Sequence, residues 1–170
     1  MNKVLIACIG NIFLGDDAFG VEVAQRLTQV PLPDQVTVKD FGVRSFDLAY
    51  ALMDAWDLVI LVDAVPRGGT PGTIYVIEPD VEAITDGSAN TSLDAHTIDA
   101  HTMNPVSVIQ MVGALGGKCS RMLVVGCEPA SVEPNDGGEF RLSEPVAAAI
   151  DEAVRTIQDI LAGKVRATAA

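Results

Sequence analysis

The sequence predicts an α/β fold, a three-layer sandwich in which a sheet lies between helices. Predicted strands alternate with predicted helices along the chain. Residues 58–62 form a continuous apolar run, which is typical of a central strand buried on both faces. The 170 residues, of which 49% are hydrophobic, are enough for one domain with a substantial core. We therefore expect a single domain over residues 1–163, followed by a disordered tail at 164–170.

Five segments have the apolar composition of strands, and four have the residue spacing of helices. The strands are expected at 3–9, 36–40, 58–62, 73–77 and 122–126. The helices are expected at 17–29, 45–52, 104–115 and 143–161. A turn is expected at 41–44. Serine and asparagine side chains accept hydrogen bonds from the first N–H groups of a helix, so the predicted N-caps are Ser45, Asn104 and Ser143.

Two connections depart from simple strand–helix alternation. The strand at 73–77 follows the one at 58–62 too closely for a helical crossover, so we expect it to pair antiparallel, at an edge of the sheet. The intervening segment 66–72 is rich in glycine and proline and is expected to be a tight connection. Residues 79–100 are polar and are predicted to form a long loop of the kind that often carries function.

The composition disfavours several partners. The formal net charge is −12, from 23 acidic and 11 basic residues, so binding to nucleic acid or to an anionic membrane surface is not expected. No apolar run approaches the ~20 residues of a membrane-spanning helix, and no signal peptide is recognised. The cysteines, Cys8, Cys119 and Cys127, have no paired spacing, which is typical of free thiols in a reducing cytoplasm.

The stretch from Ile9 to Gly20 connects the first strand to the first helix. Gly10 and Gly15 have the spacing of a phosphate-binding loop, but Asp16 and Asp17 stand where such a loop needs Lys and Ser or Thr. Because two carboxylates repel phosphate, no nucleotide cofactor is expected. The HExxH zinc motif and the GxSxG nucleophile motif are also missing from the sequence.

Two carboxylates and one imidazole are the remaining candidates for chemistry. Asp17 follows the first strand, Asp63 ends the strand at 58–62, and His101 precedes the helix at 104–115. If the two strands are parallel neighbours, both acids open onto the same edge of the sheet. Two oxygen ligands and one imidazole suit a divalent cation with open coordination positions.

Simpler roles for the same residues stay open at this point. Asp16 or Asp17 could cap the first helix, and Asp63 could belong to a turn. His96 competes with His101, and spacing alone does not choose between them. A nucleophilic Cys127 paired with a histidine is a further alternative, although a buried and inert thiol is the simpler interpretation.

Several segments together resemble one known family. They are Gly10-Asn11, Gly15-Asp16-Asp17 with Gly20, Val62-Asp63-Ala64-Val65, Gly68-Gly69 with Pro71-Gly72, His101-Thr102-Met103-Asn104-Pro105, Gly126-Cys127-Glu128-Pro129 and Leu142-Ser143 with Pro145-Val146. In this order, over about residues 3–160, the chain resembles the hydrogenase maturation endopeptidases, which process the large subunit of nickel–iron hydrogenases. Each motif alone is weak, but their order and spacing are specific.

The resemblance implies a twisted, mainly parallel sheet of about five strands between helices, as in phosphorylase- or hydrolase-like folds. It implies an aspartyl-type endopeptidase that removes the C-terminal extension of the large-subunit precursor once nickel is in place. The metal contacts carried over are Asp17, Asp63 and His101, with nickel supplied by the substrate. Met-Asn-Pro follows His101, which favours it over His96. Many relatives have Glu at the position of Asp17, and the shorter Asp retracts the carboxylate by one methylene.

The catalytic candidates are Asp17, Asp63 and Asp16. A water activated by the metal or by one of these carboxylates would attack the peptide bond. Two alternatives from other classes remain open. One is a non-catalytic nickel carrier with the same ligands, and the other is a phosphorylase-like enzyme with the same sheet topology.

Overall fold

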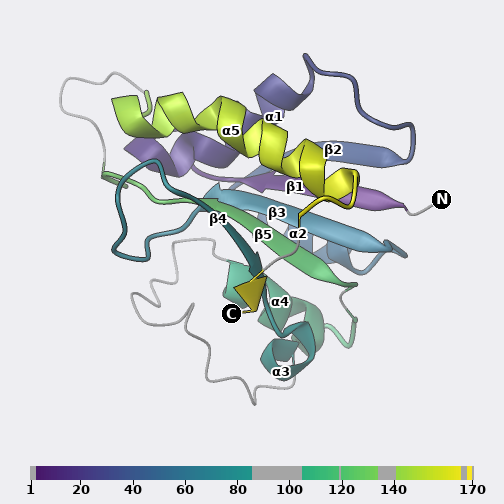
Figure 1. Ribbon diagram of the computed structural model, residues 1–170. Coiled ribbons are helices and arrows are strands. Elements are labelled where there is room, and N and C mark those ends of the chain that lie inside the picture. The colour runs from purple at the N-terminus through teal and green to yellow at the C-terminus, as the bar shows by residue number, and fades with distance from the viewer. Residues whose placement is uncertain (1–2, 86–104, 119, 134–140, 166–167, 170) are drawn as a thin grey trace.

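The computed structural model describes residues 3–85, 105–118, 120–133, 141–165 and 168–169 (Figure 1). The strands are β1 (Val4–Ile9), β2 (Val36–Gly42), β3 (Leu58–Ala64), β4 (Ile74–Glu78), β5 (Met122–Cys127) and β6 (Thr168–Ala169). The helices are a short 3₁₀ helix, η1 (Gly15–Ala18), then α1 (Phe19–Leu27), α2 (Ser45–Leu52), α3 (Val81–Thr85), α4 (Pro105–Ala114) and α5 (Glu144–Leu161).

These strands form one sheet in the order β2-β1-β3-β5-β4-β6. The neighbours β2, β1, β3 and β5 are all parallel, whereas β4 pairs antiparallel with β5. Helices α1 and α5 cover one face of the sheet, and α2 and α4 cover the other (Figure 1). The predicted three-layer α/β sandwich with a mainly parallel sheet is therefore confirmed, and so is the antiparallel pairing of β4. Its expected place at the edge of the sheet is wrong, because β6 pairs with its other side.

The central strands contribute to two separate cores, which explains their continuous apolar sequences. Alternate residues of a strand point to opposite faces of the sheet. In β1, Val4, Ile6 and Cys8 therefore pack against α1 and α5. Leu5, Ala7 and Ile9 pack on the other side, against α2 and α4. All six residues of β1 and all six of β5 are buried.

Several local predictions are wrong. The loop expected at 79–100 contains a short helix, α3, in its described part, and residues 86–100 lie outside the described residues. The turn expected at 41–44 begins later, because β2 continues to Gly42 and the Gly42 carbonyl accepts a hydrogen bond from the Gly10 N–H at 3.1 Å. Ser45 is the first residue of α2 rather than its cap, a position taken by Arg44. The first helix, expected from Asp17, begins as the 3₁₀ turn η1 and becomes α-helical only at Phe19.

The end of the chain returns to the sheet. The Lys164 N–H donates a hydrogen bond to the Asp159 carbonyl at 2.9 Å, after α5 has ended. Thr168–Ala169, which fall within the tail expected to be disordered, pair parallel with β4 as β6. Among the described helices, none combines the length and apolarity that crossing a membrane requires.

Candidate active site

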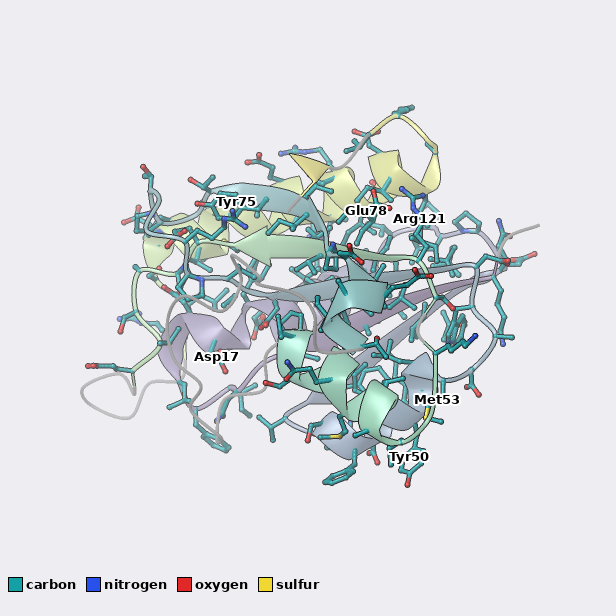
Figure 2. All side chains as sticks on the ribbon, turned by 90° about the horizontal axis from the view of Figure 1, so that it is seen from below. Asp17, Tyr50, Met53, Tyr75, Glu78 and Arg121 are labelled. Atoms are coloured by element: carbon teal, nitrogen blue, oxygen red, sulfur yellow. The ribbon has the colours of Figure 1, made fainter. Side chains whose placement is uncertain are left out.

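Asp17 and Asp63 lie at the same edge of the sheet, as predicted. Strands β1 and β3 are parallel neighbours, with Cys8 opposite Val62, so both end on the same side. Asp63 is the penultimate residue of β3 and is only 4% exposed. Asp17 lies in η1, which follows β1, and is half-buried. Figure 2 shows the Asp17 side chain on the side of the sheet where β5 also ends.

Two glycines allow η1 and α1 to approach the sheet this closely. A Cβ on Gly20 would lie 2.1 Å from the Ile9 carbonyl oxygen and 2.5 Å from that of Val62. A Cβ on Gly10, which has φ +149°, would lie 2.0 Å from the Asp17 carbonyl oxygen. Both distances are far inside van der Waals contact, so only glycine fits at either position. Gly10 and Gly20 of the sequence motif therefore bring Asp17 toward the end of β3.

One oxygen of each site carboxylate is held by a backbone N–H group. The Asn11 N–H donates to Asp17 Oδ2 at 2.8 Å, and the Ala64 N–H donates to Asp63 Oδ1 at 2.8 Å. The backbone therefore orients Asp17 and Asp63 through one oxygen of each carboxylate.

Burial disfavours the charged form of both acids, and repulsion by Asp17 adds to this effect at Asp63. Burial raises the pKa of Asp17, although the hydrogen bond from Asn11 partly offsets this. Burial also raises the pKa of Asp63 well above its ordinary value, and the negative charge of Asp17 raises it further. The hydrogen bond from Ala64 acts in the opposite direction. A cation between these carboxylates would relieve both costs, because an opposite charge nearby favours the ionised form.

Asp16, by contrast, has a structural role. Its side chain is 1% exposed and accepts four hydrogen bonds from the connection between β5 and α5. The donors are the N–H groups of Ala130, Ser131 and Ser143 and the hydroxyl of Ser143, at 2.7 to 3.2 Å. Ser143 occupies the predicted N-cap position of α5, but its hydroxyl binds Asp16 and makes no capping hydrogen bond. Asp16 therefore fastens η1 to the start of α5.

Glu128 is a third buried carboxylate, to which the sequence alone assigns no role. It directly follows β5, is 4% exposed, and binds the loop that follows Asp63. It accepts hydrogen bonds from the Arg67 N–H at 2.9 Å, the Gly68 N–H at 3.1 Å and the Tyr75 hydroxyl at 2.8 Å. An acid immediately after a fully buried strand was the available sequence signal.

The hydrogen bonds to Glu128 favour its charged form, and the loop that it binds is tightly packed at Gly69. Burial raises the pKa of Glu128, but the hydrogen bonds from Arg67, Tyr75, Gly69 and Gly68 lower it, and the net pKa is below the ordinary value. A Cβ on Gly69 would lie 2.2 Å from the Tyr75 hydroxyl oxygen, so a larger residue would displace the hydroxyl that donates to Glu128. The Gly68-Gly69 segment is thereby fixed a few residues beyond Asp63.

The described cysteines are poor nucleophiles. Cys8 and Cys127 are buried free thiols. Burial raises the pKa of Cys127 to about 12, with Asp16, Glu128 and Glu152 adding negative charge. Burial and the charge of Asp40 raise the pKa of Cys8 even further. These thiols stay protonated at neutral pH, which argues against a nucleophilic Cys127.

His101, His96 and Cys119 lie outside the described residues, so the third predicted metal contact has no structural description. Within the described ranges, no cluster of three or more histidine, cysteine, aspartate or glutamate side chains could hold a metal ion. The structure thus describes two of the three predicted contacts, Asp17 and Asp63, and brings these two together.

Comparisons with known proteins agree on one family. The sequence profile described as hydrogenase maturation protease matches residues 21–160. The chain is 32% identical to the hydrogenase expression/formation protein HupD of Rhodobacter capsulatus, over 92% of this chain and 71% of that protein. It is 28% identical to the hydrogenase 2 maturation protease of Escherichia coli, over 91% of this chain and 88% of that protein.

Solved structures show the same relationship. The hydrogenase maturating endopeptidase HybD from E. coli superposes with a TM-score of 0.75 at 28% identity, covering 95% of this chain and 93% of that one. A hydrogenase 2 maturation peptidase from Thaumarchaeota archaeon SCGC_AB-539-E09 superposes with a TM-score of 0.68, also at 28% identity, covering 96% and 99%.

Proposed function

Since this chain belongs to the hydrogenase maturation protease family, and is therefore a hydrolase that cleaves peptide bonds, we propose a specific reaction for it. It removes the C-terminal extension of a nickel–iron hydrogenase large-subunit precursor after nickel has been inserted. The observation that carries this proposal is the pairing of Asp17 with Asp63 at one edge of the sheet. Each has a backbone-oriented carboxylate and a pKa raised by burial.

Nickel belongs to the substrate in this proposal. It arrives bound to the precursor, and Asp17, Asp63 and His101 complete its coordination. The chemistry of the donors fits, since carboxylate and imidazole ligands suit a divalent cation of this type. An ion held between Asp17 and Asp63 offsets the repulsion that raises the pKa of Asp63. A precursor without nickel leaves that repulsion in place, so the carboxylate pair favours the loaded precursor.

The hydrolytic water is activated by Asp63 or by the substrate's nickel, close to the scissile bond. Asp16 is assigned no part in this step. Both of its oxygens are occupied by donors from the connection between β5 and α5. We propose that the reaction takes place in the cytoplasm, which the free thiols Cys8 and Cys127 suit.

The mass of the precursor distinguishes this proposal from a nickel carrier. Nickel-loaded precursor is incubated with the purified protein, and its intact mass is measured. The proposal predicts a decrease equal to the mass of the C-terminal extension. A carrier would bind nickel and leave the mass unchanged.

His101→Ala is expected to lose processing and His96→Ala to keep it, whereas loss in the His96 variant alone would show that the wrong histidine was chosen.

A further inference from the structure

Helix α2 is apolar on two faces. Leu48, Ala49 and Leu52 are fully buried on its inner face. A second row at helical spacing is exposed, with exposed fractions of 38% to 62%: Val43, Phe46, Tyr50 and Met53. This row is called the α2 stripe below. A surface helix normally carries polar residues on its outer face, and a helix that is apolar all round is normally buried. The α2 stripe therefore has the composition of a covered surface.

The α2 stripe begins beside the candidate active site. Val43 directly follows Gly42, whose carbonyl accepts the hydrogen bond from Gly10. The chain continues from Gly10 to Asn11, whose N–H holds the carboxylate of Asp17. From this end the stripe runs along α2 to Met53, away from the sheet edge. Figure 2 shows Tyr50 and Met53 at the lower edge of the molecule, on the side of α2 and α4. Asp17 lies to the left of them in the same view.

Charge decides which occupant fits this surface. The α2 stripe itself carries no charge, and the neighbouring Arg44 and Asp47 form an ion pair with each other at 3.9 Å. The whole chain has a net charge of −12, so two associating copies would repel each other through their like overall charge. That repulsion disfavours a second copy as the occupant. A protein with an apolar surface and a neutral or basic surround fits better.

We propose that the α2 stripe docks the folded body of the protein substrate, so that its C-terminal segment reaches Asp17 and Asp63. This inference rests on the proposed function for the identity of the substrate. Cleavage of one bond in one folded protein needs recognition beyond the scissile bond, and remote contacts supply that binding energy. Exposed aromatic side chains such as Phe46 and Tyr50 are the residue types that dominate protein interfaces.

The test compares Phe46→Glu and Tyr50→Glu with a charge-matched control. Ala148→Glu adds the same charge at an exposed position of α5, on the opposite face of the sheet. Binding of nickel-loaded hydrogenase large-subunit precursor is measured by interferometry, and cleavage is followed by mass at several precursor concentrations. Each stripe variant is expected to weaken binding and raise KM about tenfold, as for a residue central to an interface, with little change in kcat. Ala148→Glu is expected to change neither constant.

Circular dichroism and thermal unfolding confirm that the variants are folded, and Phe46→Ser repeats the test without added charge. Unchanged binding and KM in Phe46→Glu and Tyr50→Glu overturn the docking proposal, even if the wild type cleaves the precursor. A wild-type dimer that these variants dissociate also overturns it, because a second copy then covers the stripe. Stripe-dependent binding without any cleavage supports the docking surface and refutes the proposed function. Absence of both binding and cleavage overturns both.

Discussion

The carboxyl groups of Asp17 and Asp63 lie close enough for the charge of Asp17 to raise the pKa of Asp63. They reach this arrangement from different elements, η1 and the end of β3. Asp16 precedes Asp17 in the sequence but faces the start of α5, where Ser143 donates to it twice. Adjacent acids in one motif thus serve different purposes, one in the candidate active site and one in the fold.

Replacing Asp63 by Asn is expected to stabilise the fold at neutral pH and to abolish processing. The pKa of Asp63 is raised in the folded state, so ionisation of this group favours the unfolded chain as pH rises above 3.8. Removing this charge is expected to increase the free energy of unfolding by about 1 kcal/mol, a gain typical of relaxed active sites. Urea unfolding, paired with precursor cleavage, measures both effects.

The pH dependence of this gain follows from the direction of the shift. An unfolded Asp ionises near 3.8, whereas Asp63 in the folded state ionises at higher pH. Wild-type stability from this group is therefore lost as pH rises through the folded pKa. The advantage of Asp63→Asn is expected to be largest at pH 7 and to shrink as pH falls toward 3.8. Asp54→Asn, at an exposed site, serves as the control, and an equal effect there would contradict the burial argument.

Replacing Asp16 by Ala is expected to destabilise the fold by about 3 kcal/mol, since it removes a buried acceptor of four hydrogen bonds from the connection between β5 and α5. The conservative change Asp16→Asn is expected to keep cleavage per folded molecule, whereas Asp17→Asn abolishes it. Chemical denaturation and cleavage rates corrected for folded fraction are the measurements. Asp151→Ala, which removes an exposed ion pair with Arg26, is expected to leave the stability almost unchanged. If the Asp16→Asn variant is stable but inactive, this result would support a catalytic role for Asp16 instead.

Replacing Glu128 by Gln is expected to loosen the loop that follows Asp63. A Gln side chain is a weaker acceptor for the N–H groups of Arg67 and Gly68, so the hydrogen exchange of these groups is expected to accelerate. The free energy of unfolding is expected to decrease by about 1–2 kcal/mol at pH 7. The net pKa of Glu128 is lowered, so its contribution is present above 4.5 and is lost as pH falls through the folded value. The difference in the free energy of unfolding between variant and wild type is therefore expected to become smaller at acidic pH. Glu82→Gln, exposed on α3, provides the comparison, and unchanged loop exchange in Glu128→Gln would argue against this role.

The buried thiols are expected to resist alkylation in the folded protein. Iodoacetamide reacts with thiolates, and burial raises the pKa of Cys127 to about 12. Peptide mapping is expected to find Cys8 and Cys127 unmodified until the protein is denatured. Cys127→Ser is expected to retain precursor cleavage. Rapid modification of Cys127, together with loss of cleavage in the serine variant, would support a cysteine nucleophile instead.

The sequence predicted those parts of the site that depend on strand order. The apolar run before Asp63 indicated a central strand, and parallel pairing of β1 with β3 was enough to bring Asp17 to the same edge. The partners of Asp16 could not be predicted, because they come from the distant connection between β5 and α5. Glu128 was part of a recognised motif, but its role depends on how the loop at 66–72 folds back over the end of β5. Local sequence patterns do not record such contacts.

Cleavage of nickel-loaded and nickel-free precursor under identical conditions tests most directly whether the Asp17–Asp63 pair recognises nickel in the substrate. Purified wild-type protein is mixed with each form of the precursor, and the shortened product is followed by mass spectrometry over time. The predicted result is processing of the loaded precursor alone, with Asp17→Asn and Asp63→Asn inactive toward both forms. Equal rates for the two precursors with the wild-type protein would contradict the nickel-recognition role of the pair.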